Sequence, residues 1–132
     1  GDVVVVAMGA EVDVAAGAQD EGRIGDLPMI ACVIRYGIDP FQREEFEAYA
    51  RNWSAPFERC GANAVGYFTP HEGSLTTGYG IYAIPSLAEY EAYKKRLADD
   101  PGARENFEFA KKQRFIRSED RIFMKIAAGP FA

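Results

Sequence analysis

The sequence has little from which to build a metal site or a disulfide framework, because its 132 residues include only two cysteines and one histidine. Two cysteines are too few to staple a small secreted domain, and one histidine excludes a histidine-rich zinc site. We therefore predict no metal and no cofactor. No apolar run approaches the roughly 20 residues of a membrane helix, so no membrane partner is expected. Acidic residues outnumber basic ones by 20 to 15, which argues against nucleic acid as a partner.

What remains is the composition of an ordinary globular protein, with 48% hydrophobic and 27% charged residues. A chain of this length predicts one domain. Cys32 and Cys60 are interpreted as thiols of a reducing compartment, which predicts a cytoplasmic protein. Cys60 is also expected to be exposed at a helix end, where a nucleophilic role is the alternative.

Residues 1–28 differ in composition from the rest of the chain. They carry a net charge of −5, which equals the net charge of the whole protein, and they contain none of its aromatic residues. A segment without aromatic side chains and with many Gly and Ala residues cannot build its own core. We expect an N-terminal arm at 1–28, which is a leader, a vector remnant or an upstream extension. A domain over 29–128 and a C-terminal tail at 129–132 follow it.

Four segments of this domain have strand patterns. Residues 29–36 are apolar on both faces until Arg35, and 64–69 and 75–84 are two further β-prone runs joined by a loop. The last strand is predicted at 121–126, where Ile122, Met124 and Ile126 alternate with Arg121, Phe123 and Lys125.

Helix signals separate these strands. Asp39–Pro40 begins a helix whose apolar stripe runs to Cys60 and includes Trp53, and Pro56 is expected to kink it. Ser86 begins a second helix with a capping box, and Asp100–Pro101 begins a third. Because Trp53 falls on the apolar stripe, we predict that it is a core residue.

The predicted order β-α-β-β-α-α-β is that of an α+β protein, a ferredoxin-like sandwich with an antiparallel four-stranded sheet and its helices on one face. The other face of the sheet would be open. Since the strands are apolar on both sides, that face needs a cover, and a second copy of the chain can supply it. We therefore predict a homodimer through the open sheet face.

Several stretches of the chain resemble a bacterial member of the NIPSNAP family: Ile34–Pro40, Phe46–Trp53, Gly66–Gly73, Ser86–Tyr93 and Arg114–Ile116. The resemblance covers residues 29–128 and leaves the arm outside. It implies a dimeric α/β-barrel, the architecture of small antibiotic-biosynthesis monooxygenases and haem-degrading oxygenases. It implies no reaction, because the family has no agreed catalytic residues. Arg35 stands one place later than the arginine of many family members, and a shift of one residue changes the face that the side chain occupies.

Five residues are candidates for lining the barrel or contacting a ligand: Arg35, Tyr67, His71, Tyr79 and Tyr82. His71, in the loop between the second and third strands, would serve as a haem ligand or general base; the alternative is a polar turn residue. The tyrosines stand beside glycines that remove side-chain bulk and can leave a cavity. The alternative is that these tyrosines simply fill the sheet.

Two functions from different classes remain. The first is a NIPSNAP-like dimeric protein of unassigned activity that binds a small apolar or aromatic molecule or a partner. The alternative is a cofactor-independent monooxygenase, or a related small enzyme, that uses a tyrosine or His71. The interior of the barrel distinguishes them, because an enzyme needs an enclosed cavity with polar groups that converge on one point.

Overall fold

The computed structural model describes residues 28–132. It contains four strands: β1 (Ile30–Ile38), β2 (Asn63–Phe68), β3 (Thr77–Ile84) and β4 (Ile116–Lys125). They form one antiparallel sheet in the order β2-β3-β1-β4, so β2 and β4 are its edges.

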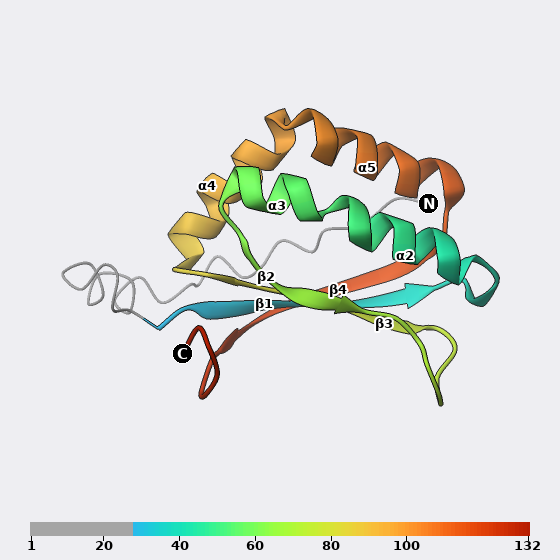
Figure 1. The fold of residues 1–132 in the computed structure, drawn as a ribbon, viewed down its shortest axis with the longest axis horizontal. Coiled ribbons are helices and arrows are strands. Elements are labelled where there is room, and N and C mark those ends of the chain that lie inside the picture. The colour runs from blue at the N-terminus through green and yellow to red at the C-terminus, as the bar shows by residue number, and fades with distance from the viewer. Residues whose placement is uncertain (1–27) are drawn as a thin grey trace.

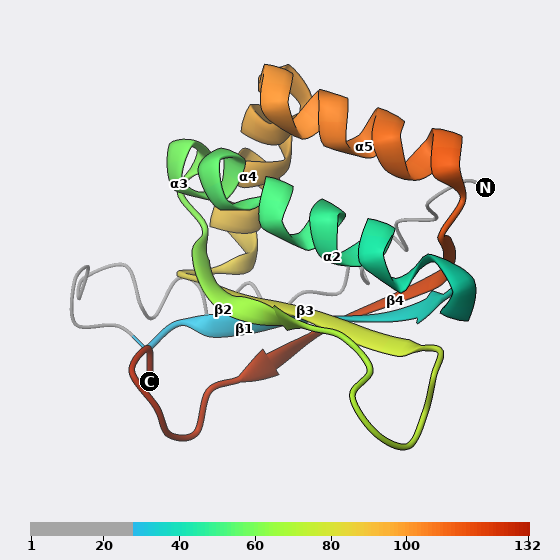
Figure 2. The ribbon, with the colours of Figure 1, turned by 45° about the vertical axis from the view of Figure 1, so that its right-hand side comes forward.

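The helices are η2 (Pro40–Gln42), α2 (Arg43–Asn52), α3 (Ser54–Cys60), α4 (Leu87–Asp99) and α5 (Pro101–Gln113). Figures 1 and 2 show that they all lie on one side of the sheet, which confirms the predicted α+β class and element order. The first predicted helix is divided at Trp53 into α2 and α3. Pro56 has no N–H to donate to the carbonyl of Asn52, which explains the interruption.

The predicted helix starts follow from local hydrogen bonds. Asp39 Oδ1 accepts from the backbone N–H of Phe41 at 3.0 Å, and Gln42 Nε2 donates to the other carboxylate oxygen at 3.2 Å. Ser86 Oγ accepts from the backbone N–H of Glu89 at 3.1 Å. The bonds from the backbone N–H groups of Phe41 and Glu89 satisfy donors that the first turn leaves without a partner in the helix.

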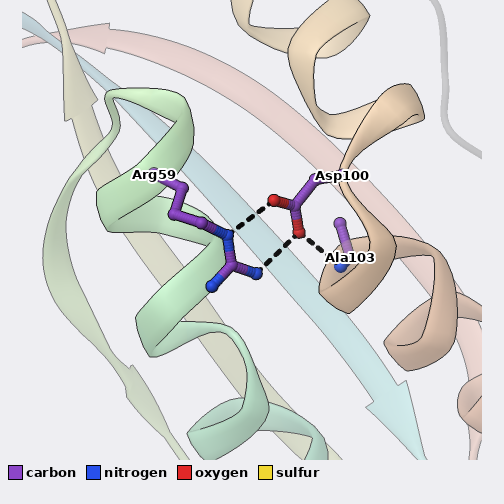
Figure 3. A network of polar contacts seen from close by, with 3 residues as sticks. All are labelled: Arg59, Asp100 and Ala103. Carbon is purple, nitrogen blue, oxygen red and sulfur yellow. Dashed lines mark hydrogen bonds and ion pairs between the residues drawn. The ribbon is translucent and has the colours of Figure 1, made fainter.

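Asp100 caps α5 and joins it to α3. Its carboxylate accepts from Arg59 Nε at 2.7 Å, from Arg59 Nη2 at 2.9 Å and from the backbone N–H of Ala103 at 2.8 Å (Figure 3). The hydrogen bonds from Arg59, and next that from Ala103, lower the pKa of Asp100 to about 2. This contact holds the junction of α4 and α5 against α3.

The core lies between the sheet and the helices. The even-numbered residues of β1 from Cys32 to Ile38 point toward the helices and are at most 2% exposed. Trp53 is also buried, as predicted. Aromatic side chains from the helices and strands fill most of the remaining space: Tyr36, Phe46, Tyr49, Phe57, Tyr82, Tyr90, Tyr93 and Phe115.

Two expectations need correction. Cys60 is buried rather than exposed, because α4 covers the end of α3 and Arg96 Nε donates to the carbonyl of Cys60 at 2.8 Å. The last strand begins at Ile116, well before 121–126. Its first half is mostly polar, so an apolar alternation is absent there, but Ile116 and residues 118–120 still pair with β1, with a register shift between them.

The two ends of the domain lie close together. The backbone N–H of Met29 donates to the carbonyl of Phe131 at 3.0 Å, so the predicted tail at 129–132 returns to the start of β1. The arm predicted for 1–28 lies outside the described residues, apart from Pro28. Within residues 28–132, no helix has the length and apolar character that a membrane crossing requires.

Candidate functional site

The side of the sheet opposite to the helices is an open face formed by odd-numbered residues of β1 and β3 and their neighbours on β2 and β4. Val33 lies at its centre, between Ile81 on β3 and Ile122 on β4. Large apolar side chains around it are 37–51% exposed: Phe68, Tyr79, Ile122 and Met124. The open face is therefore a continuous apolar surface in contact with solvent.

Two of the predicted site residues meet on the open face. Arg35 on β1 is the direct cross-strand neighbour of Tyr79 on β3. On its other side Arg35 Nη2 lies 3.1 Å from Asp120 Oδ2 of β4. The two charges pair with each other, so together they add no net charge to the apolar surface.

The other predicted residues lie elsewhere. Tyr82 points into the core and is 4% exposed, and Tyr67 also faces the helices. His71 is exposed in the loop between β2 and β3, which turns to the open side of the sheet (Figure 2). The structure thus distributes the candidates among the open face, the core and a loop.

Tyr67 lines a groove of about 370 Å³ between edge strand β2 and the helices α2 and α3. Aromatic side chains line this groove; Phe46, Trp53 and Phe57 are at most 5% exposed, and Tyr67 is the partly exposed ring among them. The rings of Trp53 and Phe57 stack with centroids 5.3 Å apart, and Phe57 stacks on Tyr67 at 6.3 Å. Phe46 continues the wall toward the start of α2. The polar lining residues are Glu47, Arg51, Ser54 and Thr69.

Two glycines of β3 make room for these rings. A Cβ atom at Gly80 would stand 2.6 Å from the ring of Tyr67, and one at Gly78 would stand 2.9 Å from the ring of Phe46. Glycine therefore lets the aromatic side chains lie directly on the strand. The space that the sequence suggested as a cavity is filled by Tyr67 and Phe46, and the groove lies beside it.

Behind the groove, the tyrosine hydroxyls are buried. The hydroxyls of Tyr67 and Tyr36 share a hydrogen bond of 3.2 Å, and Tyr49 packs against both rings. Burial raises the pKa of all three tyrosines, because a phenolate would lose its hydration. These phenols are therefore neutral at physiological pH and act as hydrogen-bonding groups rather than as bases.

Sequence reasoning missed a buried ion pair on the helix side of β4. Arg121 Nη2 lies 2.7 Å from Glu119 Oε1, and the side chains are 10% and 2% exposed. Burial raises the pKa of Glu119, and the charge of Arg121 opposes that effect. The sequence did contain a sign of this pair. Glu119 and Arg121 alternate with residues of the open face and lie on the same side of the strand as Phe123, which packs against the core.

The NIPSNAP family model matches residues 32–129. A NIPSNAP family protein of unknown function from Agrobacterium tumefaciens has a similar solved structure, with a TM-score of 0.68 and 19% identity over 81% of this chain and 96% of that one. The solved structure of a NIPSNAP-like domain protein from Burkholderia xenovorans is also similar. Its TM-score is 0.64 and its sequence identity 17%, over 79% of this chain and 91% of that one. Among curated proteins, none matches this chain.

The fold is also similar to that of a proposed antibiotic biosynthesis monooxygenase from Caulobacter crescentus. The TM-score is 0.57 and the identity 10%, over 84% of this chain and 99% of that one. Identities this low show a shared fold and carry no activity with them. The family match is different in kind, because it spans nearly the whole described domain. On that match, the chain belongs to the NIPSNAP family, whose solved relatives from Agrobacterium tumefaciens and Burkholderia xenovorans are of unknown function or uncharacterised.

Proposed function

We propose that this protein is a homodimeric binding protein whose groove between β2 and α2–α3 holds a small apolar or aromatic molecule. The observation that carries the proposal is the aromatic wall of the groove, built from Trp53, Phe57 and Tyr67. Small-molecule sites are typically concave, about 300–1,000 Å³ in volume, and apolar with a few polar groups. The groove has this volume and this chemistry.

The chemistry of the groove favours binding over catalysis. The monooxygenase alternative requires a base from a tyrosine or from His71. Burial keeps Tyr67 protonated, and His71 is exposed in a loop and does not line the groove. A neutral phenol can position a ligand by a hydrogen bond but cannot accept its proton at neutral pH.

Groove binding is tested with 2-naphthol, a neutral aromatic probe, by saturation-transfer difference NMR. Ala50 lines the groove, so Ala50→Phe is expected to fill it and reduce the transfer strongly. Ala88→Phe, on the exposed side of α4, is the matched control and is expected to leave the transfer unchanged. No transfer to the unaltered protein, or equal transfer to the Ala50→Phe variant, would contradict the proposal.

The second part of the proposal is that two copies cover each other's open face. The sheet offers a plane on the order of 500 Å² at ordinary strand spacing. The loop between β2 and β3 and the C-terminal segment lie on the same side and extend this surface (Figures 1 and 2). A stable complex buries about 800 Å² per partner, which such a surface can approach.

Charge also favours a second copy as the cover. Arg35 and Asp120 stand on neighbouring strands of the open face, one positive and one negative. A two-fold axis brings the same surface from both subunits together, so each arginine can meet the aspartate of the other subunit. An apolar face with this self-complementary pair suits a copy of itself better than an acidic or basic partner.

We also place the protein in the cytoplasm. Cys32 and Cys60 are both free thiols and both buried, which suits a reducing compartment. Fractionation of the source cells with an antibody tests this placement, and recovery in an oxidising compartment would contradict it.

A further inference from the structure

We infer that the groove selects a zwitterionic aromatic molecule of the aromatic amino acid class, whose ring meets the aromatic wall while Glu47 and Arg51 bind its ammonium and carboxylate groups. This inference rests on the proposed binding function and adds the chemical class of the ligand. It is carried by the two charges that line the groove and by the aromatic side chains beside them.

The charges at the rim are arranged as a pair but do not pair. Glu47 and Arg51 are one turn apart on α2, and both line the groove. A glutamate four residues before an arginine is the favourable order for an ion pair along a helix. In residues 28–132, however, the ion pairs involve other side chains, such as Lys94 with Glu91 at 3.2 Å. Glu47 and Arg51 are therefore available to opposite charges on a ligand.

The opposite wall of the groove is formed by β2 and by Thr69, the residue that follows it. The Oγ1 of Thr69 is closed off from solvent, so it offers a ligand no hydrogen bond. The charged contacts for the head of a ligand therefore come from Glu47 and Arg51 on α2.

The aromatic wall accounts for the rest of the ligand. Trp53, Phe57 and Tyr67 line the groove; Trp53 and Phe57 are 3% and 5% exposed and Tyr67 is partly exposed, so Tyr67 offers the larger surface to a ring. A single aromatic ring gains both apolar burial and ring–ring contact there. Neither an aliphatic zwitterion nor an uncharged aromatic compound uses both parts of the groove, so both are expected to bind more weakly.

Trp53 provides the measurement, because it is the only tryptophan of the chain and lines the groove. Its fluorescence is titrated with L-phenylalanine, with 3-phenylpropanoate, which lacks the ammonium group, and with 2-phenylethylamine, which lacks the carboxylate. We expect L-phenylalanine to bind up to about fivefold more tightly than either analogue, the upper end of the range for one exposed ion pair.

Two variants assign each charge to its partner. Arg51→Gln is expected to weaken the binding of L-phenylalanine and 3-phenylpropanoate, which both carry a carboxylate, and to leave the binding of 2-phenylethylamine unchanged. Glu47→Gln is expected to weaken the binding of L-phenylalanine and 2-phenylethylamine, which both carry an ammonium group, and to leave the binding of 3-phenylpropanoate unchanged. Arg104→Gln, on the exposed side of α5, is the matched control and is expected to change none of the three.

The outcomes separate this inference from the proposed function. Equal binding of the three compounds, or the same response of all three to Arg51→Gln, overturns the zwitterion inference. If 2-naphthol still shows saturation transfer in that case, the binding function stands alone. If neither 2-naphthol nor L-phenylalanine binds, both proposals are wrong.

Discussion

Neighbouring substitutions on β1 are expected to have opposite consequences, because successive side chains of a strand point to opposite faces. Val33 lies on the open face, and Ile34 is 2% exposed against the helices. We expect Val33→Asp to give a folded monomer and Ile34→Asp to give an unfolded chain. The same chemical change thus tests the interface and the core separately.

The free energy of folding that Ile34→Asp is expected to remove approaches the whole stability of the domain. Removing a buried isoleucine costs about 2–5 kcal/mol, and a buried carboxylate adds several more. Arg121 is the cross-strand neighbour of Ile34, but it already pairs with Glu119, so a second carboxylate would lack a partner of its own. A domain of this size is typically stable by about 5–15 kcal/mol, which such a loss can exhaust.

Val33→Asp is expected to make the free energy of dimer formation less favourable, rather than that of folding. Its neighbours Ile81 and Ile122 leave the aspartate without a partner once a second copy covers the face. Each copy then loses about 2–3 kcal/mol of apolar contact and desolvation. Because the change occurs twice in a two-fold dimer, the dissociation constant is expected to rise by about 10³–10⁴-fold.

The measurement is sedimentation velocity over a range of concentrations, together with circular dichroism to establish folding. Ala88→Asp, on the exposed side of α4, is the control and is expected to remain a folded dimer. A Val33→Asp variant that dimerises like the unaltered protein refutes the assignment of the open face as the interface. An Ile34→Asp variant that folds refutes the assignment of that side to the core.

Three further outcomes are expected. Arg121→Met should lower the free energy of unfolding in urea by about 3–5 kcal/mol, because it leaves Glu119 buried without its partner. Adding Glu119→Leu should recover most of that loss, and a double variant as unstable as the single one would contradict this explanation. The pKa of Asp100 is about 2, below its unfolded value, so its ionised form stabilises the fold above about pH 4 and this contribution is lost as the pH falls toward 2. Asp100→Asn should therefore lower the melting temperature at pH 7 and make it fall less between pH 4 and 2, and an unchanged acid profile would count against the cap. Removing the residues before Met29 should leave the domain folded, and a fall in melting temperature well beyond about 4–8 °C, the shift per kcal/mol in a small domain, would show that the arm is part of the core.

The sequence by itself determined the order of the elements and most of their ends. Asp39, Ser86 and Asp100 are helix caps whose partners lie within three residues, so the signal and the structure are both local. The apolar stripe that includes Trp53 is also local, because its period belongs to one helix. Signals of this kind do not depend on what packs against the element, and for that reason they could be predicted.

Only the tertiary structure decided which face each strand presents to the helices. Tyr67 and Tyr79 belong to one hairpin, yet one lies under the helices and the other lies on the open face beside Arg35. Both faces of these strands are apolar, so the pattern alone does not distinguish them. The burial of Glu119 likewise depends on Arg121 and on the helices that cover both residues. The direction of a side chain follows from strand register and from the layer that covers it, and both depend on residues distant in the sequence.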